Sequence, residues 1–292
     1  MESPARRKLL KNARNKRVRK NACTYSFYIV GGIVLFALLI GGLAYGAHRS
    51  EVTITGVRVS GAEVADEQDI VSRAEAALSG AYLFMFPKAN FFLYPENAIV
   101  REILASDTRI KSTDVSRSGV EITVTVVEHT PTYLWCDTTD DRRTRMNADG
   151  KERIDADGSE QGDEECFFTN DEGYVFSEAP LFSGNVYITL RGPLYGEGTD
   201  PRGKRYLPLE QFKKISQLLA LLSQQKIAAH SVRAMGSGDY AVGVRNGLEV
   251  RFSIAQDTGR LAENLQSASA ALVDTNDIEY IDLRFGNKVF YK

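Results

Sequence analysis

The segment Thr24–Ala47, TYSFYIVGGIVLFALLIGGLAYGA, contains no charged residue and follows a tail rich in arginine and lysine. An α-helix rises about 1.5 Å per residue and crosses a hydrocarbon core of roughly 30 Å with about 20 residues. Tyrosines near both ends favour the membrane–water interface, and the glycines are tolerated better in lipid than in water. The sequence therefore predicts a transmembrane helix over residues 24–47.

The tail at residues 1–23 carries nine basic side chains and a single acidic one, Glu2. Positive charge beside the first apolar helix keeps that end in the cytoplasm, so we expect the rest of the chain outside. The tail also suits anionic lipid, and nucleic acid is disfavoured because no aromatic residues are interleaved. A cleaved signal peptide is the main alternative, but signal h-regions of about 7–15 residues are much shorter than this segment.

The three cysteines divide between the two sides of the membrane. Cys23 lies at the cytoplasmic margin, and Cys136 and Cys166 are both expected outside, where disulfides persist. Cys136 ends one strand-like run and Cys166 begins the next, which favours a bridge over two separate buried thiols. The chain has no Asn-x-Ser/Thr sequon, so nothing indicates a glycosylated ectodomain, and we expect the bacterial inner membrane.

About 240 residues follow the apolar segment, enough for two modest domains. The first, at residues 52–130, opens with a β-rich segment at 52–59. Asp66 is the expected N-cap of a helix with apolar residues at helical spacing, and Pro95 marks the start of a second helix. Two alternating strands at 110–127 meet at a short turn. The predicted order is strand, helix, helix, strand, strand.

The second domain, residues 131–292, is predicted to be a β-sheet of short strands with helices on one face. Pro208 opens one helix with an apolar stripe, and another helix covers residues 261–272. The chain closes with a strand, a Gly286-Asn287 turn and a last strand. The fold class is therefore α+β, with a single transmembrane helix at the N-terminus.

The segment at residues 137–165 is rich in Asp, Glu, Gly and Arg, and such a composition cannot bury enough apolar surface to order itself. We predict a long, solvated acidic loop. Asp155-Ala156-Asp157-Gly158 matches part of a calcium-binding loop, but the first ligand position would be Arg153, which repels a cation. A solvated loop is therefore favoured over a metal site.

No constellation of catalytic residues is evident in the sequence. Neither CxxC nor HExxH occurs, and the three histidines lack metal-ligand spacing. Ser237 lies in Gly-Ser-Gly, which falls short of a nucleophile elbow and favours a turn. Gly198 to Lys204 match GxxxxGK, but Arg205 occupies the place of the magnesium-binding hydroxyl. We therefore expect no enzyme activity, no cofactor and no small-molecule substrate.

Four segments carry a resemblance to a known family. They are VTITGVRVSG at 52–61, VSRSGVEITVTVVEHTPTYLW at 115–135, CFFTNDEGYVF at 166–176, and EYIDLRFGNKVFYK at 279–292. In this order, behind a basic tail and a single span, they resemble the FtsQ/DivIB bacterial cell-division proteins. The two external cysteines and the acidic insertion between them depart from the family's pattern.

The resemblance implies a POTRA domain at residues 52–130, a C-terminal β domain at 131–292, and a scaffold without chemistry of its own. Family members anchor in the inner membrane at the division septum. They contact the partners called FtsB/DivIC and FtsL, and through them the septal peptidoglycan synthase. The alternatives are a POTRA-bearing envelope export or assembly factor and, less favoured, an envelope hydrolase.

An exposed edge strand offers unpaired N–H and C=O groups that an extended segment of a partner can satisfy. The terminal hairpin fits this mode of binding, with Ile281, Leu283 and Phe285 on one face and Asp282 and Arg284 on the other. The alternative is an ordinary hairpin whose aromatic residues belong to the core. The expected partner-binding residues are Tyr280, Ile281, Leu283, Arg284, Phe285, Val289 and Tyr291.

Overall fold

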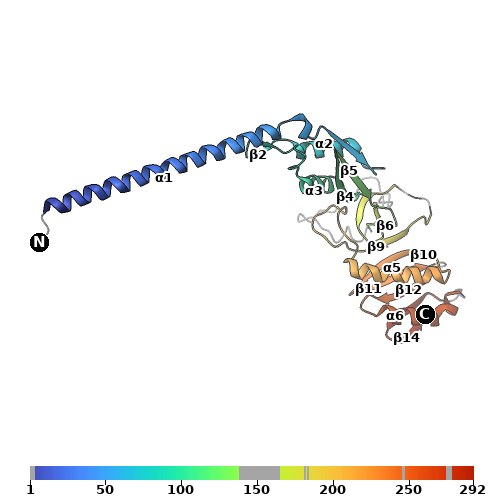
Figure 1. The fold of residues 1–292 in the computed structure, drawn as a ribbon. Helices are drawn as coiled ribbons and strands as arrows, with labels where there is room; N and C mark the ends of the chain where they lie inside the picture. Colours follow the sequence, from blue (N-terminus) through green and yellow to red (C-terminus); the bar gives the residue numbers. More distant parts are fainter. Residues whose placement is uncertain (1–3, 138–164, 181, 183, 245–246, 274–277) are drawn as a thin grey trace, which may run out of the picture. The chain divides into compact units, whose positions relative to one another are not determined.

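The structure, a computed structural model, describes residues 4–137, 165–180, 182, 184–244, 247–273 and 278–292. Most of the predicted acidic loop, including the calcium-like segment, lies outside the described residues. The protein is a mixed α+β chain with one long N-terminal helix and a large mixed sheet (Figure 1).

The chain divides into two compact units. Unit 1 comprises Met1–Ile103 and Thr113–Val126, and unit 2 comprises Leu104–Ser112 and Val127–Lys292. Each unit has its own sheet, so each is described separately below.

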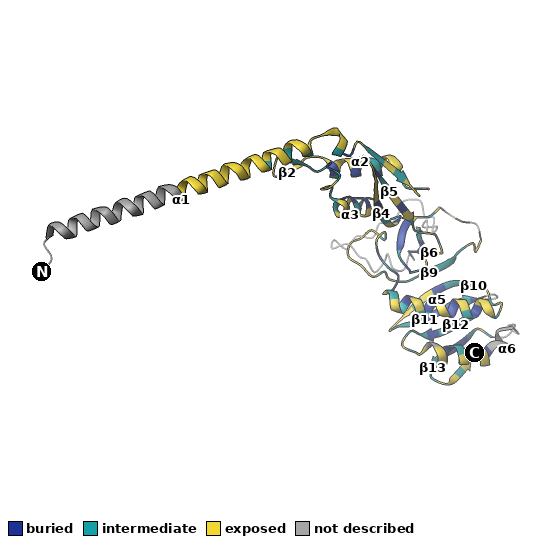
Figure 2. Ribbon diagram, viewed as in Figure 1, coloured by how far each residue is buried: buried dark blue, intermediate teal, exposed yellow. Residues whose placement is uncertain are grey.

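Helix α1 (Pro4–Ala47) continues from the basic tail through the apolar segment without a break. Within it, Tyr25–Ala47 is long and apolar enough to cross a membrane, with a mean hydropathy of 2.4. The side chains of this segment are exposed almost throughout (Figure 2). A helix that is apolar on all sides needs an apolar environment, and the part of the chain that the structure describes leaves most of this surface uncovered.

Unit 1 follows α1 with a short turn and then alternates strands and helices. The elements are η1 (Ser50–Val52), β1 (Gly56–Ser60), α2 (Glu67–Leu78), β2 (Ala81–Tyr82), β3 (Phe86–Pro87), α3 (Glu96–Ser106), β4 (Ile110–Ser118) and β5 (Glu121–Glu128). The larger sheet has the order β1-β5-β4, with β1 parallel to β5. Strands β2 and β3 form a separate antiparallel pair.

The helices of unit 1 begin where their sequences predict. The Asp66 carboxylate accepts a hydrogen bond of 2.9 Å from the Gln68 N–H and so caps α2. Three residues at a spacing of four, Ile70, Ala74 and Leu78, form the buried side of that helix. Pro95 directly precedes α3, and its carbonyl oxygen accepts the first hydrogen bond of the helix from Ile99.

Two features of unit 1 differ from the sequence prediction. Residues 52–55, expected within the first strand, lie before it, because the Ile54 N–H donates to Ala89 and the Phe91 N–H donates to Val52. The hairpin β2–β3 was not predicted, because each of its strands has only two residues.

Unit 2 is built on a nine-stranded sheet with the order β14-β13-β12-β11-β10-β9-β6-β7-β8. Its strands are β6 (Tyr133–Cys136), β7 (Cys166–Thr169), β8 (Val175–Glu178), β9 (Ile188–Arg191), β10 (Ala229–Gly236), β11 (Asp239–Val244), β12 (Glu249–Ser253), β13 (Tyr280–Phe285) and β14 (Lys288–Tyr291). Parallel pairs occur at β6/β9, β9/β10 and β12/β13, and the other neighbours are antiparallel.

Helices α5 (Leu209–Gln224) and α6 (Thr258–Val273) contact each other and cover one face of this sheet. Pro208 directly precedes α5, as the sequence predicts. The apolar stripe of α5 includes Phe212, Ile215 and Leu219, and all three are buried in a core shared with the strands. The helices thus protect one face of the sheet.

A disulfide joins Cys136 and Cys166, which lie directly opposite each other on β6 and β7. The two cysteines are 30 residues apart in sequence. In the chain-entropy model, closing a loop of that length stabilises the folded state by about 3–4 kcal/mol. The bridge joins the last residue of β6 to the first residue of β7.

Candidate partner-binding edge

The terminal hairpin, β13 and β14, ends the nine-stranded sheet of unit 2. Ile281 pairs with Tyr291 and Asp282 pairs with Phe290, and the register shifts before Phe285 reaches Lys288. The turn between the strands uses Gly286 with a φ of +65°. A glycine at the first central position suits a two-residue hairpin turn, because L-residues with side chains rarely adopt positive φ.

Strand β14 pairs with β13 on one side and has no other neighbour in the sheet among the described residues. Lys292 donates to and accepts from Tyr280, so the backbone polar groups of Lys292 point toward β13. Successive residues of a strand alternate in this direction, and the N–H and C=O groups of Val289 and Tyr291 therefore point away from the sheet. This open row of donors and acceptors can accept an additional strand.

Three aromatic side chains surround the open strand. Phe285 is 54% exposed, Phe290 48% and Tyr291 47%. The rings of Phe285 and Phe290 meet edge to face with their centroids 5.2 Å apart. We call Phe285 together with Lys288–Tyr291 the terminal edge. It combines unpaired backbone groups with apolar surface, as strand-addition sites do.

Partly buried charges on β11 and β13 stabilise the terminal edge. The Arg284 guanidinium donates to Asp282 at 2.6 Å and to Asp239, on β11, at 2.7 Å. Burial acts to raise the pKa of Asp282, but the hydrogen bonds and charge of Arg284 outweigh it and hold that pKa below its usual value. Hydrogen bonds to Asp282 and then Asp239 raise the pKa of Arg284. The hairpin is therefore fixed by charge pairs as well as by its core contacts.

A second charge cluster continues across β10, β12 and β13. Glu249 accepts hydrogen bonds from Arg233 at 2.7 Å and from Arg251 at 3.2 Å. Burial acts to raise the pKa of Glu249, but its two arginine partners lower it overall. Arg251 also lies over the ring of Tyr280, 3.8 Å from the centroid. Tyr280 thus faces this cluster.

The structure places the seven predicted partner-binding residues in different environments. Ile281 and Leu283 are completely buried beneath the helices, so the prediction that these two side chains contact a partner is wrong. Their burial follows from the alternation of the strand, which turns them toward the core. Arg284 is committed to two carboxylates, and Tyr280 lies under Arg251.

The remaining predicted residues, Phe285, Val289 and Tyr291, belong to the terminal edge. Val289 packs partly against the core, so what it presents at the edge is its outward backbone groups. Phe290 was missed by the sequence analysis. Phe290 pairs with Asp282, so its side chain lies on the face of the sheet opposite to Ile281 and the core. Its alternation with Val289 and Tyr291 is the sequence signal that could have identified it.

Residues considered for catalysis have structural roles. The Lys204 ammonium bonds to the Gly198 carbonyl, and Asp200 binds Arg202 at 2.7 Å, so these charges of the P-loop-like segment are already satisfied. Ser237 has a φ of +54° in the turn between β10 and β11. Among the described residues, no group of three or more His, Cys, Asp and Glu side chains is arranged to hold a metal.

His129 lies in an aromatic environment in unit 2. Its ring packs against Tyr174 and Phe176, and its Nδ1 is 3.0 Å from the side-chain nitrogen of Asn170. Burial, followed by the nearby charge of Lys111, lowers the pKa of His129. The Asn170 amide oxygen also accepts from the Glu172 and Tyr174 N–H groups, so these contacts stabilise the β7–β8 turn.

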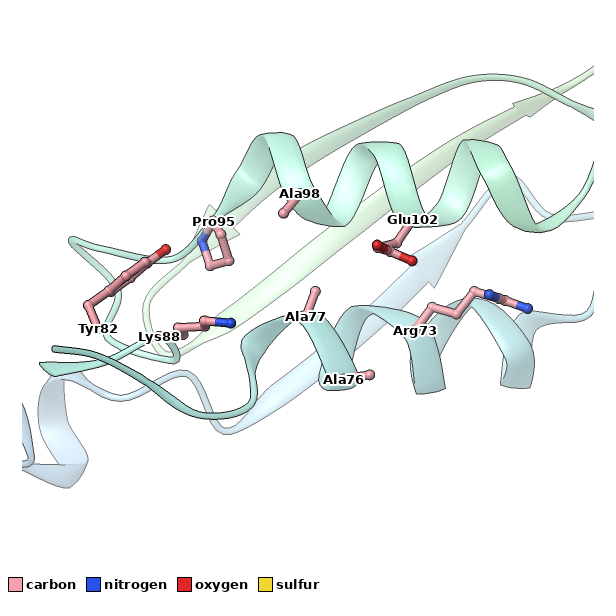
Figure 3. A pocket seen from close by; sticks show the side chains of 8 residues that line it. All are labelled: Arg73, Ala76, Ala77, Tyr82, Lys88, Pro95, Ala98 and Glu102. Carbon is pink, nitrogen blue, oxygen red and sulfur yellow. The ribbon is translucent and has the colours of Figure 1, made fainter. Parts of the chain in front are cut away.

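A hollow of about 590 Å³ lies between α2 and α3 in unit 1 (Figure 3). Its sides are the small residues Ala76, Ala77 and Ala98, with charged groups toward both ends. Arg73 at one end is bound to Asp69 at 2.7 Å. A site of this composition has few polar groups that converge on a ligand, so it is a weaker candidate than the terminal edge.

A scan against models of known protein families finds no match to this chain, and a search of curated proteins also finds none.

Proposed function

We propose that this protein is a membrane-anchored scaffold of the bacterial cell-division machinery, of the kind formed by the FtsQ/DivIB proteins. In this role it binds FtsB/DivIC-type and FtsL-type partners and so influences the septal peptidoglycan synthase. The observation that carries the proposal is the open strand β14, with its outward backbone groups and exposed aromatic side chains.

The arrangement of unit 1 supports the same proposal. A helix suited to a single membrane crossing leads into two helices packed with a three-stranded sheet. The order of these elements resembles a POTRA domain with an additional short hairpin. The basic tail favours a cytoplasmic N-terminus, so the two units would lie on the outer side of the inner membrane.

Strand addition explains how such a protein would recognise an extended partner. The backbone groups of Val289 and Tyr291 give affinity for any chain in β conformation, and the exposed Phe285 and Phe290 add apolar contact for chosen side chains. The core side chains Ile281 and Leu283 and the Arg284 pairs keep the hairpin in place before the partner arrives. Preorganisation of this kind reduces the entropic cost of binding.

The most direct test removes the outward N–H of Tyr291 and leaves the hydrogen bonds between β14 and β13 intact. Tyr291→Pro deletes this donor, and Tyr291→Ala is the matched control that removes the ring and keeps the donor. With the full chain in nanodiscs and an FtsB/DivIC-type partner, we expect the proline variant to bind about tenfold more weakly than the alanine variant. Equal affinities of the two variants would exclude backbone pairing at this position.

Localisation separates this proposal from the alternative of an export or assembly factor. A fluorescent fusion of the full chain should gather at midcell in dividing cells. Uniform distribution around the envelope would favour the alternative, and turnover of peptidoglycan by the purified protein would instead indicate an enzyme.

A further inference from the structure

The hairpin β2–β3 carries apolar side chains that no described residue covers. Phe84 is 100% exposed and Leu83 82% exposed, and both lie in the loop that joins the two strands. A little further along the chain, Phe92 is 77% exposed. We call Leu83, Phe84, Met85, Phe92 and Leu93 the juxtamembrane patch. Isolated exposed apolar residues are common, but several large apolar residues exposed within a short segment are typical of a surface that contacts another molecule or a membrane.

The backbone of the hairpin loop adopts a conformation that its residues disfavour. Leu83 has a φ of +50° and Phe84 a φ of +61°, and the Met85 N–H donates to the Tyr82 carbonyl at 3.1 Å. Turns with two positive φ values are dominated by Gly, Asn and Asp, because bulky side chains clash there. Two large apolar residues are therefore held at the tip against their own conformational preference.

The same segment is fastened to the end of α1. The buried side chain of Asn90 donates to the carbonyl of Ala47, the last residue of α1, at 3.1 Å. This carbonyl is one of those that a helix leaves unpaired at its C-terminus. The Phe91 N–H donates to Val52 at 3.0 Å and the Ile54 N–H to Ala89 at 2.7 Å. Residues 89–91, which lie between the two parts of the juxtamembrane patch in the sequence, are thus fixed beside the end of the apolar segment.

The hairpin also lies along the helix itself. Strand β3 contacts α1, and Figure 1 shows the hairpin beside the C-terminal end of the helix. Within Tyr25–Ala47, Ile40, Ala44 and Ala47 are half-buried and all other side chains are exposed. These three residues share one helical face, as a spacing of four and three requires. Ile40 lies about 10 Å below Ala47 along the helix axis.

These positions relate the hairpin to the depth of a bilayer. The 23 residues of Tyr25–Ala47 span about 35 Å, a few ångströms more than a hydrocarbon core. Strand β3 contacts α1 and Asn90 binds the last residue of that helix, so the hairpin lies where the apolar segment ends, at the boundary between headgroups and acyl chains. Apolar groups that lie on a membrane are buried to a similar depth, about 5–10 Å.

We propose that the juxtamembrane patch inserts into the outer leaflet of the membrane that α1 crosses, with Leu83 and Phe84 as its deepest residues. The ligand is the lipid surface itself. Insertion would fix unit 1 against the membrane at a second point, in addition to the covalent connection through Arg49. This inference rests on the membrane span of the proposed function and is independent of any protein partner.

The test measures the depth of a probe in the full chain. Cys23→Ser removes the cysteine within α1, and the disulfide of unit 2 stays intact. Met85→Cys, labelled with an environment-sensitive fluorophore, places the probe beside Leu83 and Phe84 without altering them. The control is Glu67→Cys, an exposed position at the start of α2, whereas the hairpin follows the end of that helix. Both variants are reconstituted into phosphatidylethanolamine–phosphatidylglycerol vesicles that contain lipids with a doxyl quencher on the acyl chain.

We expect quenching at position 85 to be at least about twofold stronger than at position 67, and stronger for a shallow than for a deep doxyl group. Equal quenching at both positions would overturn the proposal and leave the juxtamembrane patch available to a protein. Flotation of the chain with the vesicles tests the span separately, so loss of membrane anchoring is distinguished from failure of the hairpin to insert.

A second variant tests the two tip residues. Leu83→Asn with Phe84→Gly removes the apolar groups and installs residues that the turn prefers, so the fold is retained. Quenching at position 85 should fall to the level of position 67 in this variant. Undiminished quenching would show that Leu83 and Phe84 do not hold the loop in the lipid and would overturn their assignment.

Discussion

The two hairpins β2–β3 and β13–β14 both expose aromatic side chains, but they differ in their turn residues and in how much of each hairpin is buried. The terminal hairpin turns on Gly286, whose positive φ costs little, and it buries Ile281 and Leu283. The hairpin of unit 1 turns on Leu83 and Phe84, which are strained and fully or almost fully exposed. The first is stable within its own sheet. The second exposes its tip residues, in keeping with the proposal that the membrane covers them.

The largest expected difference between the hairpins is in core packing. Leu283→Ala leaves a cavity beneath the helices and should lower the free energy of unfolding by about 2–5 kcal/mol. Leu83→Ala, at the exposed tip, should change it by about 0.5 kcal/mol or less. Urea unfolding of the full chain in detergent tests the first change through Trp135, the single tryptophan, which is buried in unit 2. Circular dichroism follows both variants, and similar losses for the two would contradict the comparison.

The next effect concerns the ion pairs of Arg284 with Asp282 and Asp239, which stabilise the terminal hairpin. Asp282→Ala leaves Arg284 with one carboxylate and should lower the free energy of unfolding by about 1–3 kcal/mol. Because the folded-state pKa of Asp282 lies below its ordinary value, the folded protein binds fewer protons than the unfolded chain. The stability from this pair is therefore present at neutral pH and is lost in acid, as the pH falls below the ordinary pKa of an aspartate and through the lowered pKa of Asp282.

Thermal unfolding across this pH range would measure the effect. Asp282→Asn should flatten the loss of stability in acid, with Glu249 contributing the remaining slope. The matched control is Glu210→Gln on the surface of α5, whose partner is Lys213 and which is 81% exposed. Such a surface pair should contribute little at any pH. An unchanged acid slope in Asp282→Asn would show that the pair does not control stability.

Exchange of turn residues should move the two hairpins in opposite directions. Gly286→Ala introduces a side chain at positive φ and should cost about 1–2 kcal/mol, although no atom lies within 4 Å of the added Cβ. Leu83→Asn with Phe84→Gly should instead stabilise unit 1 by about 1–2 kcal/mol in detergent. Hydrogen exchange of amides in the two hairpins would report each change separately. Destabilisation by both variants would mean that the conformation at the tip is not strained.

The smallest expected effect is the contact between the aromatic rings at the terminal edge. A double-mutant cycle of Phe285→Ala and Phe290→Ala should give a coupling of about 0.5–1 kcal/mol, since their edge-to-face pair is half-exposed. Phe91 and Phe92, whose ring centroids are 4.0 Å apart, offer the corresponding pair in unit 1. A coupling near zero for Phe285 and Phe290 would mean that the contact between their rings does not stabilise the hairpin.

Local patterns in the sequence predict most of the elements. Asp66, Pro95 and Pro208 mark helix starts because their effects depend on the adjacent backbone, and Gly286 marks a turn for the same reason. The hairpin β2–β3 escapes such analysis, because two residues per strand give no alternation to detect. Its signal is the apolar run from Leu83 to Phe86, bounded by Gly80 and Pro87, which is too short to distinguish a strand from a core segment.

The sequence by itself determined the apolar helix, the α+β character and the terminal pair of strands, because each depends on periodicity, charge or turn residues within a short window. The tertiary structure decided which side chains of the terminal strands are free. Strand alternation predicts two faces, but only the packing of α5 and α6 selects the face with Ile281 and Leu283 as the buried one. It also decided that Asn90 reaches the end of α1, since a contact across 43 residues leaves no local pattern in the chain.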